Sequence, residues 1–128
     1  MRVLIVEDSD SICRMMEALI SARGYSVRSA SNGARGIEEA LSFKPHVVLL
    51  DINLPGSYDG IQVCEKLRAD DTTRDVPIIM VSAMTDEEIK RRASDAGATA
   101  YYEKPFSPLS LLKEIERLAK ASGASSSA

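Results

Sequence analysis

Short apolar runs alternate five times with stretches of helical periodicity, and this alternation constrains the fold more than any other feature of the chain. The runs are RVLIVED, YSVRSA, HVVLL, VPIIMVSA and ATAYY, which begin at residues 2, 25, 46, 76 and 98. Continuous apolar runs of this length are typical of strands covered on both faces. Strands that alternate with helices pair in parallel through right-handed crossovers. The sequence therefore predicts an α/β fold, with one parallel sheet between two layers of helices.

The helical stretches are recognised by the spacing of their apolar residues and by their end signals. Between residues 9 and 25 the apolar residues recur three and four apart, and Gly24 then supplies a helix stop. We expect Met15 and Met16 in this stretch to fill core space. The other inward faces are predicted to be Ala34, Ile37, Ala40 and Leu41; Ile61, Cys64 and Leu67; Ile89, Ala93 and Ala96; and Leu111, Leu112, Ile115, Leu118 and Ala119.

Three helix starts carry capping signals. Asn32 is expected to cap the second helix, Thr85 and Glu88 to form a capping box at the fourth, and Ser107 to precede Pro108 at the last. The fourth helix offers the core only three apolar residues, two of them alanines. Because it buries less apolar area than the others, we expect it to be the most weakly held.

Length, charge and cysteine content narrow the class of protein. A chain of 128 residues is expected to form one domain over residues 1–120, with a flexible tail or truncated linker over 121–128. The net charge of −3 and the scattered basic residues predict no nucleic-acid binding, and no apolar run approaches membrane-spanning length. Cys13 and Cys64 are expected to be small core residues in a reducing cytoplasm, and His46 an ordinary strand-edge residue.

Polar side chains follow four of the five predicted strands. Glu7 and Asp8 follow the first, Asp51 the third, Ser82 the fourth and Lys104 the fifth. Ligands of open parallel sheets bind at this edge. Alone, Asp8 could simply cap a helix and Lys104 could be solvated, so only their convergence favours a site. Clustered carboxylates repel each other unless a cation lies among them, and all-oxygen ligation suits Mg²⁺. A metal, a lysine and a hydroxyl around one carboxylate suit phosphoryl transfer, with Asp51 as the nucleophile.

Four segments together resemble the receiver domain of bacterial two-component response regulators, in the form of a single chemotaxis-regulator-like receiver. They are VLIVED, VVLLDINLPG with DG after it, PIIMVSA, and GATAYYEKPF, and the resemblance spans residues 2–120. It implies a flavodoxin-like doubly wound (βα)5 fold, with five parallel strands in the order 2-1-3-4-5. It also implies a cytoplasmic signalling switch in a phosphorelay. Such a domain is not an enzyme in the usual sense, because it catalyses only its own phosphorylation and dephosphorylation.

The resemblance further implies an acceptor and a metal site. Asp51 would accept a phosphoryl group from a sensor histidine kinase or a phosphotransfer protein. Glu7, Asp8 and Asp51 would hold Mg²⁺, and Asn53 would add its backbone carbonyl.

It implies a switch as well. Ser82 and Lys104 would bind the phosphoryl group, and Tyr101 would turn inward when Ser82 is drawn to it. The Lys104–Pro105 bond is usually cis in this family. The surface of the fourth helix, fifth strand and fifth helix would then change and control a downstream protein or output domain. Weak homodimerisation through these helices is left open.

Two departures from the family pattern are visible. Gly56, Ser57 and Tyr58 make the loop after Pro55 one residue longer than usual, and Ser82 replaces a commoner threonine. Ala83 is small and would leave a phosphoryl group open to water, so we expect hydrolysis that is not unusually slow.

Three other classes of protein are alternatives to the switch. A dehalogenase-like phosphohydrolase would carry its nucleophile on the first strand and a carboxylate two residues later, where this chain has Asn53. A flavin-binding domain of the same topology would need phosphate-binding loops in place of the acidic EDSDS. A degenerate receiver, acting only as a phosphorylation-independent docking module, remains the alternative, although all the chemical residues are present.

Overall fold

Five parallel strands form a central sheet in the order β2-β1-β3-β4-β5. In the computed structural model, which describes residues 1–84 and 86–121, they are β1 (Arg2–Val6), β2 (Ser26–Ala30), β3 (Val47–Asp51), β4 (Ile78–Ser82) and β5 (Ala100–Glu103). Each strand overlaps one of the five apolar runs, and every pairing is parallel. The predicted α/β class and strand order are therefore confirmed.

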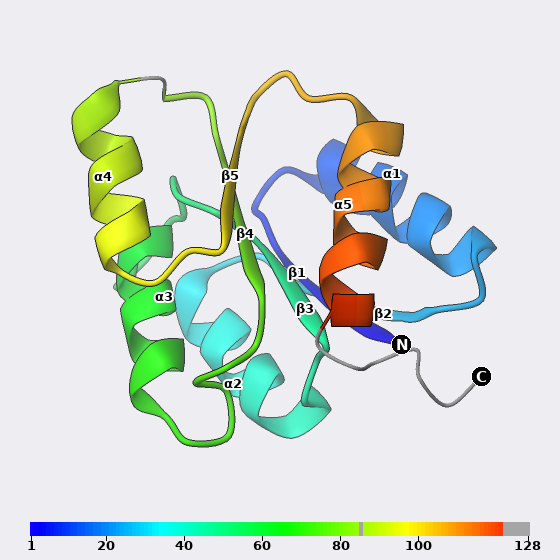
Figure 1. Ribbon diagram of the computed structural model, residues 1–128, viewed down its shortest axis with the longest axis horizontal. Coiled ribbons are helices and arrows are strands. Elements are labelled where there is room, and N and C mark those ends of the chain that lie inside the picture. Colours follow the sequence, from blue (N-terminus) through cyan, green and yellow to red (C-terminus); the bar gives the residue numbers. More distant parts are fainter. Residues whose placement is uncertain (85, 122–128) are drawn as a thin grey trace.

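Helices cover both faces of the sheet (Figure 1). On one face, α1 (Asp10–Ala22) and α5 (Pro108–Ala121) enclose the first part of the core; on the other, α2 (Gly33–Phe43), α3 (Gly60–Ala69) and α4 (Glu87–Asp95) enclose the second. Every residue of β3 and β4 is buried. This two-sided burial explains why these runs are continuously apolar. It also means that a carboxylate at the end of β3 emerges from the middle of the sheet.

The predicted face of α2 is wrong in part. Ala34 and Leu41 are exposed, whereas Gly33 and Gly36 are buried. A Cβ atom on Gly36 would lie 2.8 Å from a methyl carbon of Val6, so α2 packs closely against β1. Glycine carries no apolar side chain, and hydrophobic periodicity therefore does not reveal this close packing.

One predicted cap is also corrected. The N-cap of α4 is Asp86, whose carboxylate accepts the Ile89 N–H at 3.0 Å. Thr85, the predicted cap, lies outside the described residues. The predicted caps Asn32 and Ser107 are confirmed, since their side chains accept the N–H groups of Arg35 and Ser110.

The smaller inward face of α4 is confirmed. Ala93 is its single buried residue, whereas α3 and α5 each bury five. Arg68 of α3 connects the loop after α4 to the segment between α3 and β4. Its guanidinium donates hydrogen bonds to the carbonyl oxygens of Gly97 at 2.7 Å, Arg74 at 2.9 Å and Val76 at 2.6 Å. That α4 is the most weakly held helix stays a prediction.

The two cysteines are buried, and the single histidine is hydrogen-bonded to the backbone. Cys13 and Cys64 are buried free thiols, as predicted. His46 accepts the Arg2 N–H on Nδ1 at 2.9 Å, and burial lowers its pKa.

The last helix runs to Ala121, so the first residue of the predicted tail is helical, and residues 122–128 lie outside the described part. None of the helices within residues 1–84 and 86–121 is long and apolar enough to cross a membrane.

Candidate functional site

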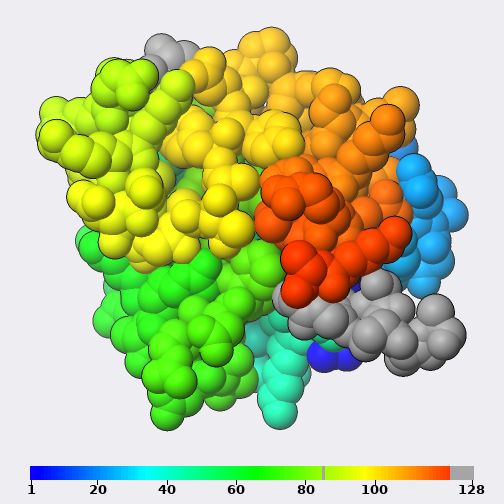
Figure 2. Space-filling view, in the orientation of Figure 1, coloured from blue at the N-terminus to red at the C-terminus, as the bar shows by residue number. Residues whose placement is uncertain are grey.

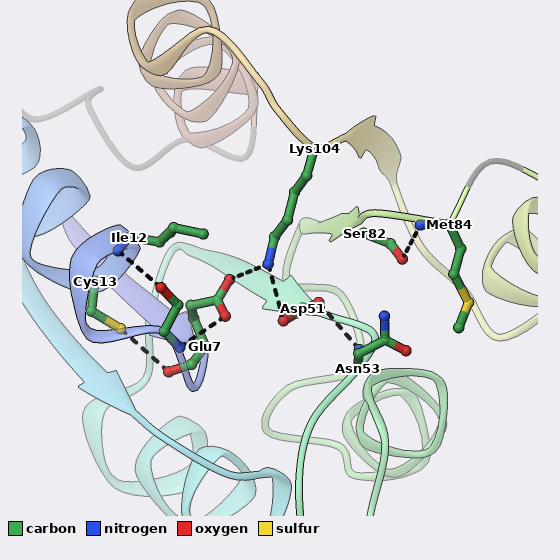
Figure 3. Close-up of polar contacts among 9 residues, drawn as sticks. Glu7, Ile12, Cys13, Asp51, Asn53, Ser82, Met84 and Lys104 are labelled. Carbon is green, nitrogen blue, oxygen red and sulfur yellow. Dashed lines mark hydrogen bonds and ion pairs between the residues drawn. The ribbon is translucent and has the colours of Figure 1, made fainter.

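The predicted polar residues meet at one edge of the sheet, where the parallel strands end (Figure 3). Glu7 directly follows β1, Asp51 is the last residue of β3, and Lys104 directly follows β5. Glu7 and Asp51 are each only 4% exposed. A buried carboxylate is costly unless it is paired or hydrogen-bonded, so the contacts of these two side chains decide what the site can do.

Lys104 lies between the two buried carboxylates. Its Nζ is 2.9 Å from Glu7 Oε1 and 3.2 Å from Asp51 Oδ2. The alternative that Lys104 is merely solvated is therefore wrong, because its ammonium group pairs with both carboxylates. The Lys104–Pro105 peptide bond is cis, as the resemblance implied.

Backbone N–H groups orient the other carboxylate oxygens. The Ser9 N–H donates to Glu7 Oε2 and the Asn53 N–H donates to Asp51 Oδ1, both at 3.1 Å. Ser9, not Asp8, caps α1 through the Ile12 N–H. The structure thus gives the exposed Asp8 no capping role.

The acidic residues have the chemistry of a hard-cation site. Ligand oxygens of Glu7, Asp8 and Asp51 all lie within 4.8 Å of one another. Three carboxylates and one lysine carry a formal excess of two negative charges. A divalent cation would neutralise that excess, and an all-oxygen donor set suits Mg²⁺. The residues present therefore fit the ion.

Ser82 is fully buried at the end of β4, and its hydroxyl is engaged by the following loop. Its Oγ accepts the Met84 N–H at 3.0 Å (Figure 3). The Met84 carbonyl in turn accepts the hydroxyl of Tyr101 at 2.8 Å. Ser82 and Tyr101, which the sequence predicted to act together, are thus joined through Met84. Sequence reasoning missed Met84, because its backbone makes both contacts and no side-chain signal marks it.

A family model settles the class of the domain. The model described as the response regulator receiver domain matches residues 3–116. The chain belongs to the response regulator receiver domain family. Receiver domains of this family are signalling switches of two-component systems, which interact with histidine kinases or phosphotransfer proteins and with output domains.

Individual proteins give the same result. The receiver is 33% identical over 117 residues to the DNA-binding dual master transcriptional regulator RpaA of Synechocystis, and the match covers 91% of this chain and 48% of RpaA. The chain thus spans about half the length of that relative. Chemotaxis protein CheY4 of Vibrio cholerae has a TM-score of 0.85 and 32% identity, covering 91% of this chain and 97% of its own. A response regulator from Chloroflexus aurantiacus also has a TM-score of 0.85 and 32% identity, with 93% and 97% covered.

An apolar depression of about 460 Å³ opens beside Lys104 of this receiver domain. It is lined by Ile12, Met15, Ala83, Lys104, Pro105, Phe106 and Pro108. Met15 is 37% exposed there, whereas Met16 is buried. The prediction that both methionines fill the core is therefore wrong for Met15, because the sequence spacing could not show that α1 turns this residue toward the edge of the site.

Two groups near the site, and Cys64 of α3, have shifted pKa values. Burial would lower the pKa of Lys104, but the hydrogen bond to Glu7 and the charge of Asp51 outweigh it, and the pKa is raised. Cys13 donates to the Glu7 carbonyl oxygen at 3.3 Å. Burial first, and the Glu7 charge second, raise the Cys13 pKa from 9.0 to about 11. Burial likewise raises the pKa of Cys64 to about 11.

We therefore expect the free energy of unfolding of the receiver domain to fall as the pH rises from 9.0 to about 11. Both thiols bind their protons more tightly when folded, so their contribution is complete below the unfolded pKa of 9.0 and is lost as the pH rises toward 11. The free energy of unfolding, measured by urea denaturation, should fall by roughly 4 kcal/mol over this range, with the two thiols contributing equally. A Cys13→Ala/Cys64→Ala variant should show a flatter pH dependence, and an equally steep one would contradict the assignment.

Proposed function

We propose that this receiver domain is a switch that accepts a phosphoryl group onto Asp51 in a Mg²⁺-dependent reaction. The observation that carries the proposal is the setting of Asp51. Its carboxylate is almost buried at the sheet edge, is oriented by the Asn53 N–H, and lies next to the Lys104 ammonium and the Glu7–Asp8 pair. A nucleophile placed beside fixed cationic charge is what phosphoryl transfer requires.

In the transfer step, a carboxylate oxygen of Asp51 forms a bond to the phosphorus of a donor phosphohistidine. The phosphorus–nitrogen bond breaks, and its electron pair stays on the imidazole nitrogen. The Asn53 N–H orients Asp51, while Lys104 neutralises charge on the phosphoryl oxygens. Glu7, Asp8, Asp51 and the carbonyl of Asn53 would hold Mg²⁺, which supplies further charge neutralisation when bound.

The donor docks, in this proposal, on the apolar depression beside the site. Ile12 and Met15 of α1 and Phe106 after β5 form an apolar surface next to Lys104. A histidine kinase or phosphotransfer protein that carries the donor histidine would bury these side chains. An apolar contact at this place brings the phosphohistidine to Asp51 without occupying the polar site itself.

The acyl phosphate adds about −1.5 to −2 charges and strong acceptor oxygens. Its oxygens draw the Ser82 hydroxyl away from the Met84 N–H, and Tyr101 turns into the space that Ser82 leaves. The contacts of Tyr101 with the β4–α4 loop are lost at the same time. On the face shown in Figure 2, α4, β5 and α5 form one continuous surface, so a change at Tyr101 alters it. That surface then controls a downstream protein or output domain in the cytoplasm.

The test measures phosphoryl uptake by intact-protein mass spectrometry. The protein is incubated with acetyl phosphate and Mg²⁺, beside Asp51→Asn and a parent sample with EDTA. We expect a gain of one phosphoryl group in the parent, and none in the variant or without metal. Uptake that persists in Asp51→Asn would contradict the assignment of the acceptor. No uptake, with Mg²⁺ binding shown separately and none from a histidine kinase donor either, would favour the docking module.

A further inference from the structure

A chain of polar contacts leads from Ser82 to the surface between α4 and β5. The Ser82 hydroxyl accepts the Met84 N–H, and the Met84 carbonyl accepts the Tyr101 hydroxyl. One backbone residue thus couples the serine beside Asp51 to the aromatic ring on β5. While both bonds are made, Tyr101 stays in the position seen here.

Lys90 of α4 continues this chain beyond the ring. Its Nζ lies 5.9 Å from the ring centroid of Tyr101 and 2.7 Å from Glu103 Oε1. Glu103 is two residues after Tyr101 on β5, and residues two apart on a strand point to the same face. Glu103 is therefore placed to fix the ammonium group over the ring. Within residues 1–84 and 86–121, Lys90 and Glu103 form no other ion pair.

We propose that Lys90 and Glu103 are positioning residues, which as an ion pair hold the ring of Tyr101 in the position seen here and so bias the unphosphorylated domain to its resting state. We call the Lys90–Glu103 ion pair the latch. The proposal rests on the proposed function, in which Tyr101 moves when Ser82 is drawn to the phosphoryl group. Lys90 acts on the ring directly. Glu103 acts by holding the Lys90 ammonium in place.

The physical argument is one of population shift. In this proposal, the contact of the Tyr101 ring with Lys90 and the hydrogen bond of its hydroxyl to the Met84 carbonyl are lost when the ring moves. An interaction made in one of two states shifts their equilibrium by its full free energy. Both Lys90 and Glu103 are partly exposed, with side-chain exposures of 34% and 44%. Cation–π contacts and ion pairs at such sites change an equilibrium by about two- to five-fold.

The experiment compares Lys90→Met, which keeps the length of the side chain without its charge, with Glu103→Gln and Lys90→Arg. We expect the first two to raise the initial rate of Asp51 phosphorylation by acetyl phosphate about two- to five-fold. Lys90→Arg keeps the cation over the ring and should match the parent. Arg74→Met is the matched control, because it breaks an exposed ion pair to Asp71 of 3.2 Å far from Tyr101.

A double-mutant cycle shows whether the effect passes through the ring. In a Tyr101→Ala background, Lys90→Met should change the rate no further. An equal acceleration in that background would overturn the latch, and so would parent-like rates for both Lys90→Met and Glu103→Gln.

A second readout separates the latch from the proposed function. Nuclear magnetic resonance of ring-labelled tyrosine reports the position of Tyr101 in the unphosphorylated protein. In Lys90→Met and Glu103→Gln, the Tyr101 resonance should move away from its position in the parent. The direction of the movement should be toward the resonance of the parent saturated with beryllium fluoride and Mg²⁺. A parent that takes up no phosphoryl group would overturn the proposed function alone. If the parent is phosphorylated but the Tyr101 resonance of Lys90→Met and Glu103→Gln stays where it is in the parent, the latch alone is overturned.

Discussion

Replacing Lys104 with methionine should destabilise the domain by about 3 kcal/mol at pH 7 in the absence of Mg²⁺. Lys104 is the one cation that pairs with Glu7 or Asp51 in the described part of the chain, and both carboxylates are 4% exposed. Removing one partner of a buried pair leaves the other charge uncompensated, which costs more than the pair contributes. Each carboxylate keeps one backbone N–H donor, so the loss is large without necessarily unfolding the protein.

Urea denaturation followed by circular dichroism measures this loss. Lys113→Met removes an exposed lysine of α5 and should change the free energy of unfolding by less than about 0.5 kcal/mol. Adding Asp51→Asn to Lys104→Met should recover much of the loss, because one of the buried charges is gone. Mg²⁺ should stabilise Lys104→Met more than the parent, since the cation then neutralises charge that the lysine no longer does. Parent-like stability of Lys104→Met would show that the carboxylates do not depend on the lysine.

The convergence of Glu7, Asp51, Ser82 and Lys104 could be predicted from the sequence because it depends on topology alone. Any residue that ends a strand of a parallel sheet lies at the same edge as the others. The contacts inside the site depend on side-chain positions in loops, and these were not predictable. Nothing in the sequence shows that Lys104 bridges Glu7 and Asp51, or that the Ser82 hydroxyl is held by Met84.

The errors in the fold have a similar cause. Apolar periodicity identified α2 as a helix but favoured Ala34 and Leu41 over Gly36 on its buried side. The pattern counts side chains that gain from burial, whereas Gly36 is buried because the β1 strand leaves no room for a Cβ. Likewise, Met15 and Met16 are equally apolar, and only the position of α1 beside the site separates the exposed residue from the buried one.

Gly60 is a second buried glycine that apolar periodicity does not reveal, and it lies next to Asp51. Among single methyl additions near Asp51, we expect Gly60→Ala to lower the free energy of unfolding the most. A Cβ atom on Gly60 would overlap the Asp51 carbonyl oxygen and lie 2.6 Å from the Ile52 Cα and 2.8 Å from the Asp51 carbonyl carbon. These are backbone atoms at the end of a buried strand, so they cannot move aside as a flexible side chain would. The start of α3 must shift instead, which breaks the 2.8 Å hydrogen bond from the Gly60 N–H to the Ile52 carbonyl.

We expect this variant to lose about 3 kcal/mol or more of its free energy of unfolding. The φ angle of Gly60 is not in the left-handed region, so the whole effect is steric. Gly56→Ala is the matched control in the same loop. Gly56 has a φ of +93° with no atom within 4 Å of an added Cβ, and its substitution should cost only about 1 kcal/mol of backbone strain. Equal losses in the two variants would mean that α3 does not press on the end of β3. A much larger loss in Gly60→Ala, with phosphoryl uptake also lost in the folded fraction, would show that this contact holds Asp51 in place.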